Sequence, residues 1–256
     1  MELAALRSQV EQALGEGFPS PFAFPGPRTI ATVPSGLDEI DALTGGLPRG
    51  RLTEISGPAS SGRASFALSV LAEMTARDEV CALVDASDSF DPYSAEAAGA
   101  RLKRLLWVRC HNLEQTLKAA DVILQGRGFG LVALDLGDVS PRSLRRVPLS
   151  FWFRFQRAVE HTPTVLLLFD EQASAKSCAS LVLQLRPKAV RWSTAAAGSV
   201  KHSYLLDQVA LSAEVVRSRL PRPPRARSWT TFHTATGWNL VPKPSHEFRL
   251  YLHSEF

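Results

Sequence analysis

The sequence predicts an α/β fold in which a mostly parallel central sheet is flanked by helices. From residue 28 onward, strand-like and helix-like segments alternate, which is typical of a parallel sheet covered on both faces. Several strand-like segments, such as residues 130–136 and 164–170, are continuous apolar runs, as buried parallel strands are. A glycine loop at residues 57–62 joins a predicted strand to a predicted helix, the context in which such loops bind phosphate.

The elements of this fold are predicted in chain order from the apolar pattern. Strands are expected at 51–56, 79–86, 104–110, 130–136 and 164–170, with helices at 63–76, 112–125 and 150–161. After residue 180 the pattern changes, and antiparallel strands at the C-terminal end of the sheet are expected at 180–187, 204–220, 228–234 and 248–253.

A separate N-terminal helix is predicted over residues 2–15, because Leu3, Leu6, Val10 and Leu14 recur at helical spacing. The prolines of residues 19–27 exclude helix and central strand, so this stretch is a linker. The apolar stripe docks either on its own domain or on a neighbouring subunit, and the sequence favours neither. The expected domains are 1–27 (N-terminal helix and linker), 28–215 (core) and 216–256 (basic, proline-rich segment with terminal strands).

Composition favours a globular cytoplasmic protein. Of the 256 residues, 45% are hydrophobic and 21% are charged. No apolar run approaches the roughly 18 residues that a membrane span needs, and the N-terminus is too polar for a signal peptide. The three cysteines and six histidines lack metal-ligand spacing, so no metal site is expected. From Arg186 onward, 11 basic residues stand against 4 acidic ones, which suggests an acidic partner, either nucleic acid or protein.

The stretch GPASSGRASF (57–66) has the outline of a phosphate-binding loop, G-x-x-x-x-G-K-[ST]. Arg63 stands where the lysine belongs, and Ala64 stands where the metal-binding hydroxyl belongs. Ser65 comes one residue late and is expected to point elsewhere on the helix. The candidate site, a vestigial phosphate loop, therefore comprises Gly57, Ser60, Ser61, Gly62, Arg63, Ala64 and Ser65.

The stretches GGLPRGRLTEISGPASSGRASFALSVL and CALVDASDSFDPYSAEAAGARLKRLLWV resemble the corresponding parts of the bacterial RecA recombinase, over roughly residues 34–136. The resemblance implies a RecA-like core. It also implies that Ser87 stands where RecA has the glutamate that orients the attacking water, with Asp88 beside it. Asp135 matches the acidic residue near the metal, whereas Ser94, next to Tyr93, replaces the tyrosine that stacks on adenine.

Several active-site elements are thus altered together, and we expect ATP hydrolysis to be absent or residual. The chain is predicted to be a pseudo-ATPase with no catalytic residues. No cofactor is expected, although loop amides alone could hold an anion, so weak ATP binding stays open.

Two groups of arginines are candidates for binding DNA or a protein partner. Where RecA has its first DNA-binding loop, this chain has Arg142, Arg145 and Arg146, and its second loop is truncated to a short segment before residue 180. The strongest charge cluster is Arg217, Arg219, Arg222, Arg225 and Arg227. It is either a solvated loop or an extended basic ribbon for phosphates or for an acidic partner surface.

A RecA-like core with a spoiled nucleotide site and shortened DNA loops resembles the ImuA-type, or SulA-like, accessory proteins of bacterial mutagenesis cassettes. This resemblance implies a non-hydrolysing accessory role in translesion synthesis during the SOS response to DNA damage. The implied partners are RecA, a Y-family polymerase homologue and an error-prone polymerase, with DNA as a further candidate and no membrane. Self-association through the N-terminal helix is a further expectation. The alternatives are an active recombinase-like ATPase that uses Arg63 and Asp88 in unusual roles, and a plain DNA-binding protein.

Overall fold

The computed structural model describes residues 5–6, 12–13, 30–193, 205–220, 227–234 and 249–250. The chain divides into two units, residues 1–30 and residues 31–256. Of the predicted N-terminal helix, Ala5, Leu6, Gln12 and Ala13 are described and are helical. Leu3, Val10 and Leu14 lie outside the described residues. Within the described ranges, no helix is long and apolar enough to cross a membrane.

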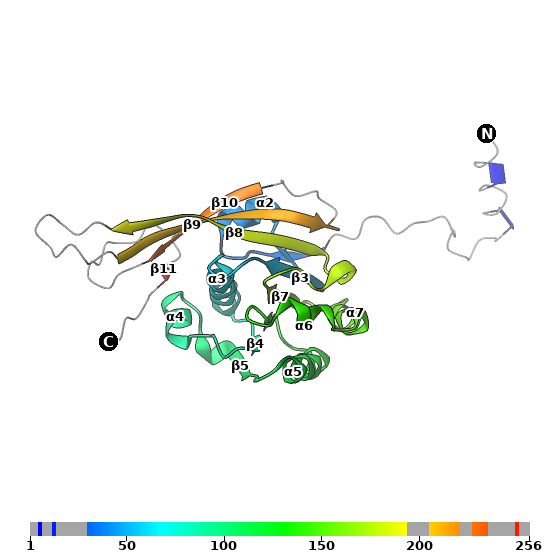
Figure 1. The fold of residues 1–256 in the computed structure, drawn as a ribbon. Coiled ribbons are helices and arrows are strands. Elements are labelled where there is room, and N and C mark those ends of the chain that lie inside the picture. Colours follow the sequence, from blue (N-terminus) through cyan, green and yellow to red (C-terminus); the bar gives the residue numbers. More distant parts are fainter. Residues whose placement is uncertain are drawn as a thin grey trace, which may run out of the picture. The chain divides into compact units, whose positions relative to one another are not determined.

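The second unit is built on a large sheet of mostly parallel strands (Figure 1). The strand order is β11-β10-β9-β8-β3-β7-β6-β4-β5. Its parallel part comprises β3 (Arg51–Ser56), β4 (Cys81–Asp85), β5 (Leu105–Arg109), β6 (Leu131–Asp135) and β7 (Val165–Asp170), and β8 (Leu181–Ser193) pairs parallel to β3. All residues of β4 and β7 are buried, which is why these strands read as unbroken apolar runs.

The C-terminal strands depart from the prediction in two respects. β8, which was predicted to be antiparallel, pairs parallel to β3 on one side and antiparallel to β9 on the other. β9 (Leu205–Ser218) and β10 (Arg227–Thr234) pair antiparallel with their predecessors, as expected, but β11 (Arg249–Leu250) runs parallel to β10. The expectation that all the terminal strands are antiparallel is therefore wrong for β11 and for the pairing of β8 with β3. β9 also crosses residue 215, so a continuous strand spans the expected domain boundary.

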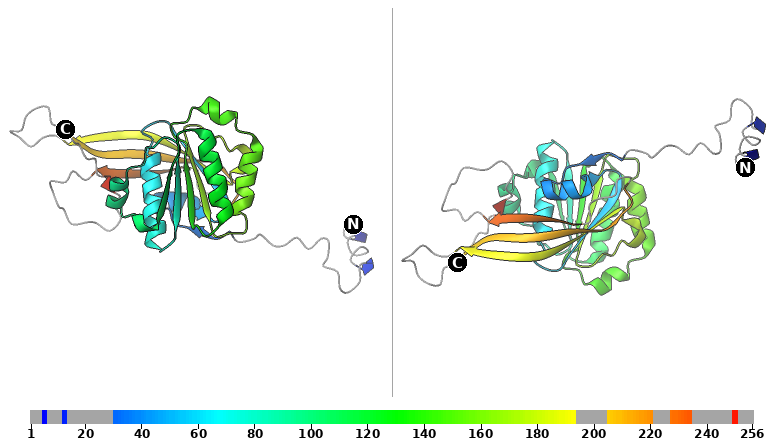
Figure 2. Two further views of the ribbon diagram at one scale, coloured as in Figure 1. Left: turned by 90° about the horizontal axis from the view of Figure 1, so that it is seen from below. Right: turned by 90° about the horizontal axis from the view of Figure 1, so that it is seen from above.

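Helices cover both faces of the sheet, and one apolar core lies on each face between the sheet and its helices (Figure 2). One core contains side chains of α2 (Asp38–Thr44) and α3 (Arg63–Ala76), with Ala95 of α4 (Pro92–Ala97). The other core contains side chains of α5 (Leu113–Gly126) and α7 (Leu149–Val159), with Leu144 of α6 (Pro141–Arg145). The predicted helices 63–76, 112–125 and 150–161 correspond to α3, α5 and α7. The short helices α2, α4 and α6, the 3₁₀ turns η1 (Leu102–Arg104) and η2 (Lys176–Cys178), and the small sheet of β1 (Thr32–Val33) with β2 (Leu47–Pro48) were not predicted.

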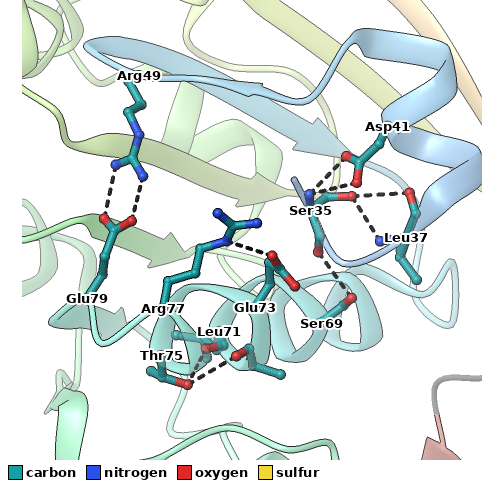
Figure 3. Close-up of polar contacts among 11 residues, drawn as sticks. Ser35, Leu37, Asp41, Arg49, Ser69, Leu71, Glu73, Thr75, Arg77 and Glu79 are labelled. Atoms are coloured by element: carbon teal, nitrogen blue, oxygen red, sulfur yellow. Dashed lines mark hydrogen bonds and ion pairs between the residues drawn. The ribbon is translucent and has the colours of Figure 1, made fainter. Parts of the chain in front are cut away.

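The segment that leads into the core is fastened to α2 and α3 by polar contacts (Figure 3). The backbone N–H of Ser35 donates to both carboxylate oxygens of Asp41, at 2.9 and 3.0 Å. The Ser69 hydroxyl on α3 donates to the Ser35 carbonyl at 3.1 Å, and Gly36 passes so close that an added Cβ would lie 2.7 Å from that hydroxyl. These contacts join the segment before α2 to α3, the helix that begins at the glycine loop.

Candidate functional site

The glycine loop leaves β3 at the carboxyl edge of the parallel strands, where ligands bind in open α/β sheets. The Gly57 N–H donates to the Asp170 carbonyl on β7 at 3.2 Å, and an added Cβ at Gly57 would lie 2.5 Å from the Leu185 carbonyl. Gly62 has φ of 86°, which glycine adopts without strain. The loop therefore runs tightly between β7 and β8 and directs the start of α3 toward the edge of the sheet.

A cavity of about 510 Å³ opens at the start of α3. Three parts of the chain line it: the loop and first turn of α3, the segments after β4 and β6, and the β8–β9 hairpin. The lining residues are Ser60, Ser61, Gly62, Arg63, Ala64, Ser65, Ser89, Asp135, Gly137, Asp138, Pro187, Val190, Trp192, Val209 and Leu211. The structure thus brings most of the predicted loop residues to one cavity, together with Asp135.

Ser65 follows Ala64 in the first turn of α3. It is buried and is among the residues that line the cavity. Ser65 supplies a hydroxyl near the loop, but Ala64 still leaves the metal-ligand position of the loop pattern without an oxygen.

Arg63 extends across the cavity to the end of β6. Its Nη1 donates to the Gly137 carbonyl at 3.2 Å. The Asp135 carboxylate accepts the Gly137 N–H at 2.9 Å, so the guanidinium and the carboxylate both lie against Gly137. Burial raises the pKa of Asp135, while the Gly137 hydrogen bond and the charge of Arg63 oppose that rise. Arg63 therefore places a positive charge beside Asp135, which the resemblance to RecA matches to the acidic residue near the metal.

The segment after β4 places its side chains in different directions. Asp88 is held by Arg109, whose Nε donates to it at 2.6 Å, and this contact holds the pKa of Asp88 below its ordinary value. Ser87 is exposed, and its N–H donates to the buried Asp85 at 3.0 Å. Of residues 87–89, Ser89 lines the cavity. Neither Ser87 nor Asp88 is among the lining residues.

The β8–β9 hairpin covers the glycine loop, and the sequence did not reveal this. Leu211 lies so close to Gly62 that an added Cβ on the glycine would be 1.9 Å from its Cδ1. Pro187 pairs with Leu211, and the register of β8 with β9 shifts between Pro187 and Ala189. A bulge of this kind turns the residues that follow it to the opposite face of the sheet. Val190 and Trp192 consequently line the same cavity as Pro187.

A second polar cluster lies beneath the short segment after β7. Glu54 and Asp170 are both fully buried. One oxygen of Glu54 accepts the N–H groups of Ser174 and Ala175 at 2.5 and 2.7 Å, and Asp170 accepts the Ser174 hydroxyl at 2.8 Å. Burial, followed by the nearby charge of Glu54, raises the pKa of Asp170 to about 9. The short segment after β7 is thus fastened to the sheet by two carboxyl groups.

The predicted arginine groups lie on different elements. Arg142, Arg145 and Arg146 are exposed, on and just after α6. Arg217 lies on β9 and donates to the Lys176 carbonyl, and Arg219 follows that strand and is exposed. Arg222 and Arg225, and the side chain of Arg227, lie outside the described residues.

Of the four apolar residues predicted for docking through the N-terminal helix, Leu6 is the one that the structure describes, and its side chain is 60% exposed.

The RecA N-terminal domain family model matches residues 2–143, more than half of the chain. The chain belongs to the RecA N-terminal domain family. The RecA protein of Picosynechococcus sp. is 35% identical over 129 residues, which is 50% of this chain and 37% of that protein. The RecA protein of Methylococcus capsulatus is 38% identical over 136 residues, or 52% of this chain and 39% of its own length, and that of Brucella anthropi is 35% identical over 145 residues, or 55% and 40%. This RecA-family chain thus spans about two-fifths of the length of these relatives.

Proposed function

We propose that this RecA-family chain is a non-hydrolysing accessory protein in DNA-damage-induced mutagenesis. It would act by binding RecA, the polymerase subunits of a mutagenesis cassette, or both, and by contacting DNA through its arginines. The observation that carries the proposal is the position of Arg63, whose guanidinium extends to Gly137 beside Asp135 in a loop where Ala64 has no oxygen.

This arrangement does not fit the magnesium–ATP that the RecA family implies. Phosphoryl transfer needs a metal ion that bridges the phosphates and a residue that orients the attacking water. At Ala64 the loop lacks the metal ligand, and the guanidinium of Arg63 brings a fixed positive charge to the place where a metal ion would meet Asp135. Two positive charges beside one carboxylate repel each other, which disfavours metal binding there.

The position of the water-orienting residue supports the same conclusion. Ser87 has no carboxylate, and Asp88 is engaged by Arg109 outside the residues that line the cavity. The alternative of an active ATPase that uses Arg63 and Asp88 would require both side chains to leave these contacts.

A phosphate-release assay with single-stranded DNA tests the enzymatic part of the proposal. We expect no turnover above the protein-free background, with a RecA recombinase as the positive control in the same buffer. Turnover comparable to the recombinase would refute a non-hydrolysing role.

A strand-exchange assay tests the accessory role. We expect the full-length chain to inhibit RecA, by capping or loosening its filaments, because a subunit that does not respond to ATP cannot extend them as the others do. Deletion of residues 1–27, and the double substitution Leu6→Glu with Val10→Glu, should relieve the inhibition while circular dichroism shows an intact fold. If the full-length chain leaves RecA unaffected, or if both variants inhibit equally well, docking through residues 2–15 is refuted.

A further inference from the structure

The connection between β7 and β8, residues 171–180, lies over the buried carboxyl groups of Glu54 and Asp170. Its buried side chains are small, and they are Ser174, Ala175, Cys178 and Ala179. Apolar burial contributes about 25 cal/mol for each Å² removed from water, so side chains of this size add little stability. Segments with few buried apolar contacts are the ones that open locally while the rest of a fold stays closed. The polar contacts of this β7–β8 connection therefore largely determine whether it stays in place.

Both carboxyl groups accept hydrogen bonds from the β7–β8 connection. The Ser174 N–H donates to Glu54 at 2.5 Å and to Asp170 at 3.1 Å, and the Ser174 hydroxyl donates to Asp170 at 2.8 Å. The Ala175 N–H donates to Glu54 at 2.7 Å. These bonds exist only while the connection covers the pair, since opening gives the same N–H groups to water.

The Glu54–Asp170 pair keeps one proton in this closed state. Two ionised carboxylates side by side in a buried place repel each other, so one of them stays protonated. Glu54 Oε2 and Asp170 Oδ1 are buried and receive no hydrogen bond from elsewhere in the described part of the chain. A proton on Asp170 lets its hydroxyl donate to Glu54, and burial, followed by the nearby charge of Glu54, raises the pKa of Asp170.

Other charged and titratable groups lie around the β7–β8 connection. Cys178 is buried within it, and burial raises the pKa of the thiol, against the opposing charges of Arg217 and Arg219, so Cys178 stays neutral near neutral pH. Arg217 donates to the Lys176 carbonyl, whereas the side chains of Lys176 and Glu171 are exposed. α7 packs against η2, and its charged side chains are exposed or bound to residues outside the connection. The proton of the carboxyl pair is thus the one that couples to opening near neutrality.

We propose that the β7–β8 connection is a pH-sensitive strap, which opens as the proton shared by Glu54 and Asp170 is released to water. In the open state both carboxyl groups are hydrated, and Asp170 has its ordinary affinity for protons. Between the ordinary pKa of 3.8 and the raised pKa of about 9, each rise of one pH unit therefore increases the equilibrium constant for opening about tenfold. Opening also breaks the hydrogen bond between the Lys176 carbonyl and Arg217, which frees a basic side chain of β9.

Amide hydrogen exchange of the full-length chain, followed by NMR from about pH 6 to pH 8, tests the strap at Ser174 and Ala175. The equilibrium constant for opening is taken from the exchange rates after correction for the pH dependence of exchange in an unstructured peptide. We expect this constant to rise about 100-fold across the two units. Asp170→Asn has no proton to release, so its constant should stay level with pH. Glu171→Gln is the matched control, because it removes an exposed carboxylate of the same connection and should keep the full slope.

The amides of β7 show whether the strap opens by itself. Ser174 and Ala175 should exchange faster than Leu167, which lies in the middle of that buried strand. Equal rates at every pH would mean that the connection opens only with the whole fold, and would overturn the strap. A constant that stays level in the unmodified chain, or that still rises about tenfold per pH unit in Asp170→Asn, would also overturn it.

Trypsin cleavage after Lys176 is a second measurement, which decides the question if Asp170→Asn does not fold. Cleavage by a protease tracks the population of the open form when opening and closing are fast. The cleavage rate of the unmodified chain, relative to that of a free peptide with the same residues, should rise with pH. A relative rate that does not change with pH would refute the strap.

Discussion

Replacement of Asp170 by asparagine should remove a pH dependence of stability that the structure predicts. Asp170 is fully buried beside Glu54, and its pKa is raised from 3.8 to about 9. Between these two values the folded chain holds a proton on Asp170 that the unfolded chain has released. Stability from this group is therefore complete below the unfolded pKa and is lost as the pH rises toward the folded pKa.

The magnitude follows from proton linkage. When only the folded state binds the proton, each rise of one pH unit lowers the free energy of unfolding by about 1.4 kcal/mol. A rise of two units near neutrality therefore lowers it by about 3 kcal/mol. Asparagine is neutral and has nearly the same shape. Its oxygen can accept the Ser174 hydrogen bonds, and its amide can donate to Glu54, so the hydrogen bonds at this position no longer depend on a proton that the side chain can lose.

The assay is urea denaturation from about pH 6 to pH 8, with the unfolding free energy taken by linear extrapolation. We expect the stability of Asp170→Asn relative to the unmodified chain to rise with pH at close to the calculated slope. Asp88→Asn is the matched control. Arg109 lowers the pKa of Asp88, so the contribution of Asp88 to stability is lost only as the pH falls through the acid range. The effect of Asp88→Asn on the free energy of unfolding should therefore not change with pH near neutrality. Equal slopes for Asp170→Asn and the unmodified chain would show that Asp170 carries no proton, which refutes the reasoning.

Two other predictions concern the loop and the arginines of α6. Gly62→Ala should destabilise the fold through both its positive φ and the clash with Leu211, and Leu211→Ala alone should cost about 2–5 kcal/mol. In urea denaturation, the double variant should cost less than the two single variants added together, whereas strict additivity would argue against the contact. Neutralising Arg142, Arg145 and Arg146 should flatten the salt dependence of DNA binding, by up to about 0.7 to 0.9 in log–log slope for each phosphate that the chain no longer neutralises. An unchanged slope would assign these residues to a protein partner or to solvent.

The sequence predicted the parallel core well because its signal is local. Strands such as β4 and β7 are buried on both faces, so their composition alone indicates where they lie. The short elements α2, α4 and α6 have too few residues for a periodic pattern, and their positions depend on tertiary contacts such as that of Ser35 with Asp41. The direction of β11 was wrong because alternation within a strand does not reveal the direction in which it pairs.

The candidate site was predictable only in part, because it too depends on contacts between residues far apart in the sequence. The glycine pattern located the loop, but nothing in the residues near it indicated that Leu211 would cover Gly62. That contact depends on the pairing register of β8 with β9, which shifts at three places along the strands, one of them between Pro187 and Ala189. The partnership of Glu54 with Asp170 joins residues more than a hundred positions apart on neighbouring strands, and only the order of the strands brings them together.

Restoring the loop pattern should not restore ATP hydrolysis. Arg63→Lys with Ala64→Thr returns the usual cation and a hydroxyl for the metal, and it frees the Gly137 carbonyl from the guanidinium. Ser87 still supplies no carboxylate to orient water, and Asp88 is still held by Arg109. Because removing a group that acts on the transition state lowers the rate by orders of magnitude, the double variant should stay near background in a phosphate-release assay, even if magnesium-dependent binding of ATP is gained. Adding Ser87→Glu is the informative third step. Turnover in the double variant itself would mean that the loop alone limits hydrolysis, and that the segment after β4 has no part in the loss.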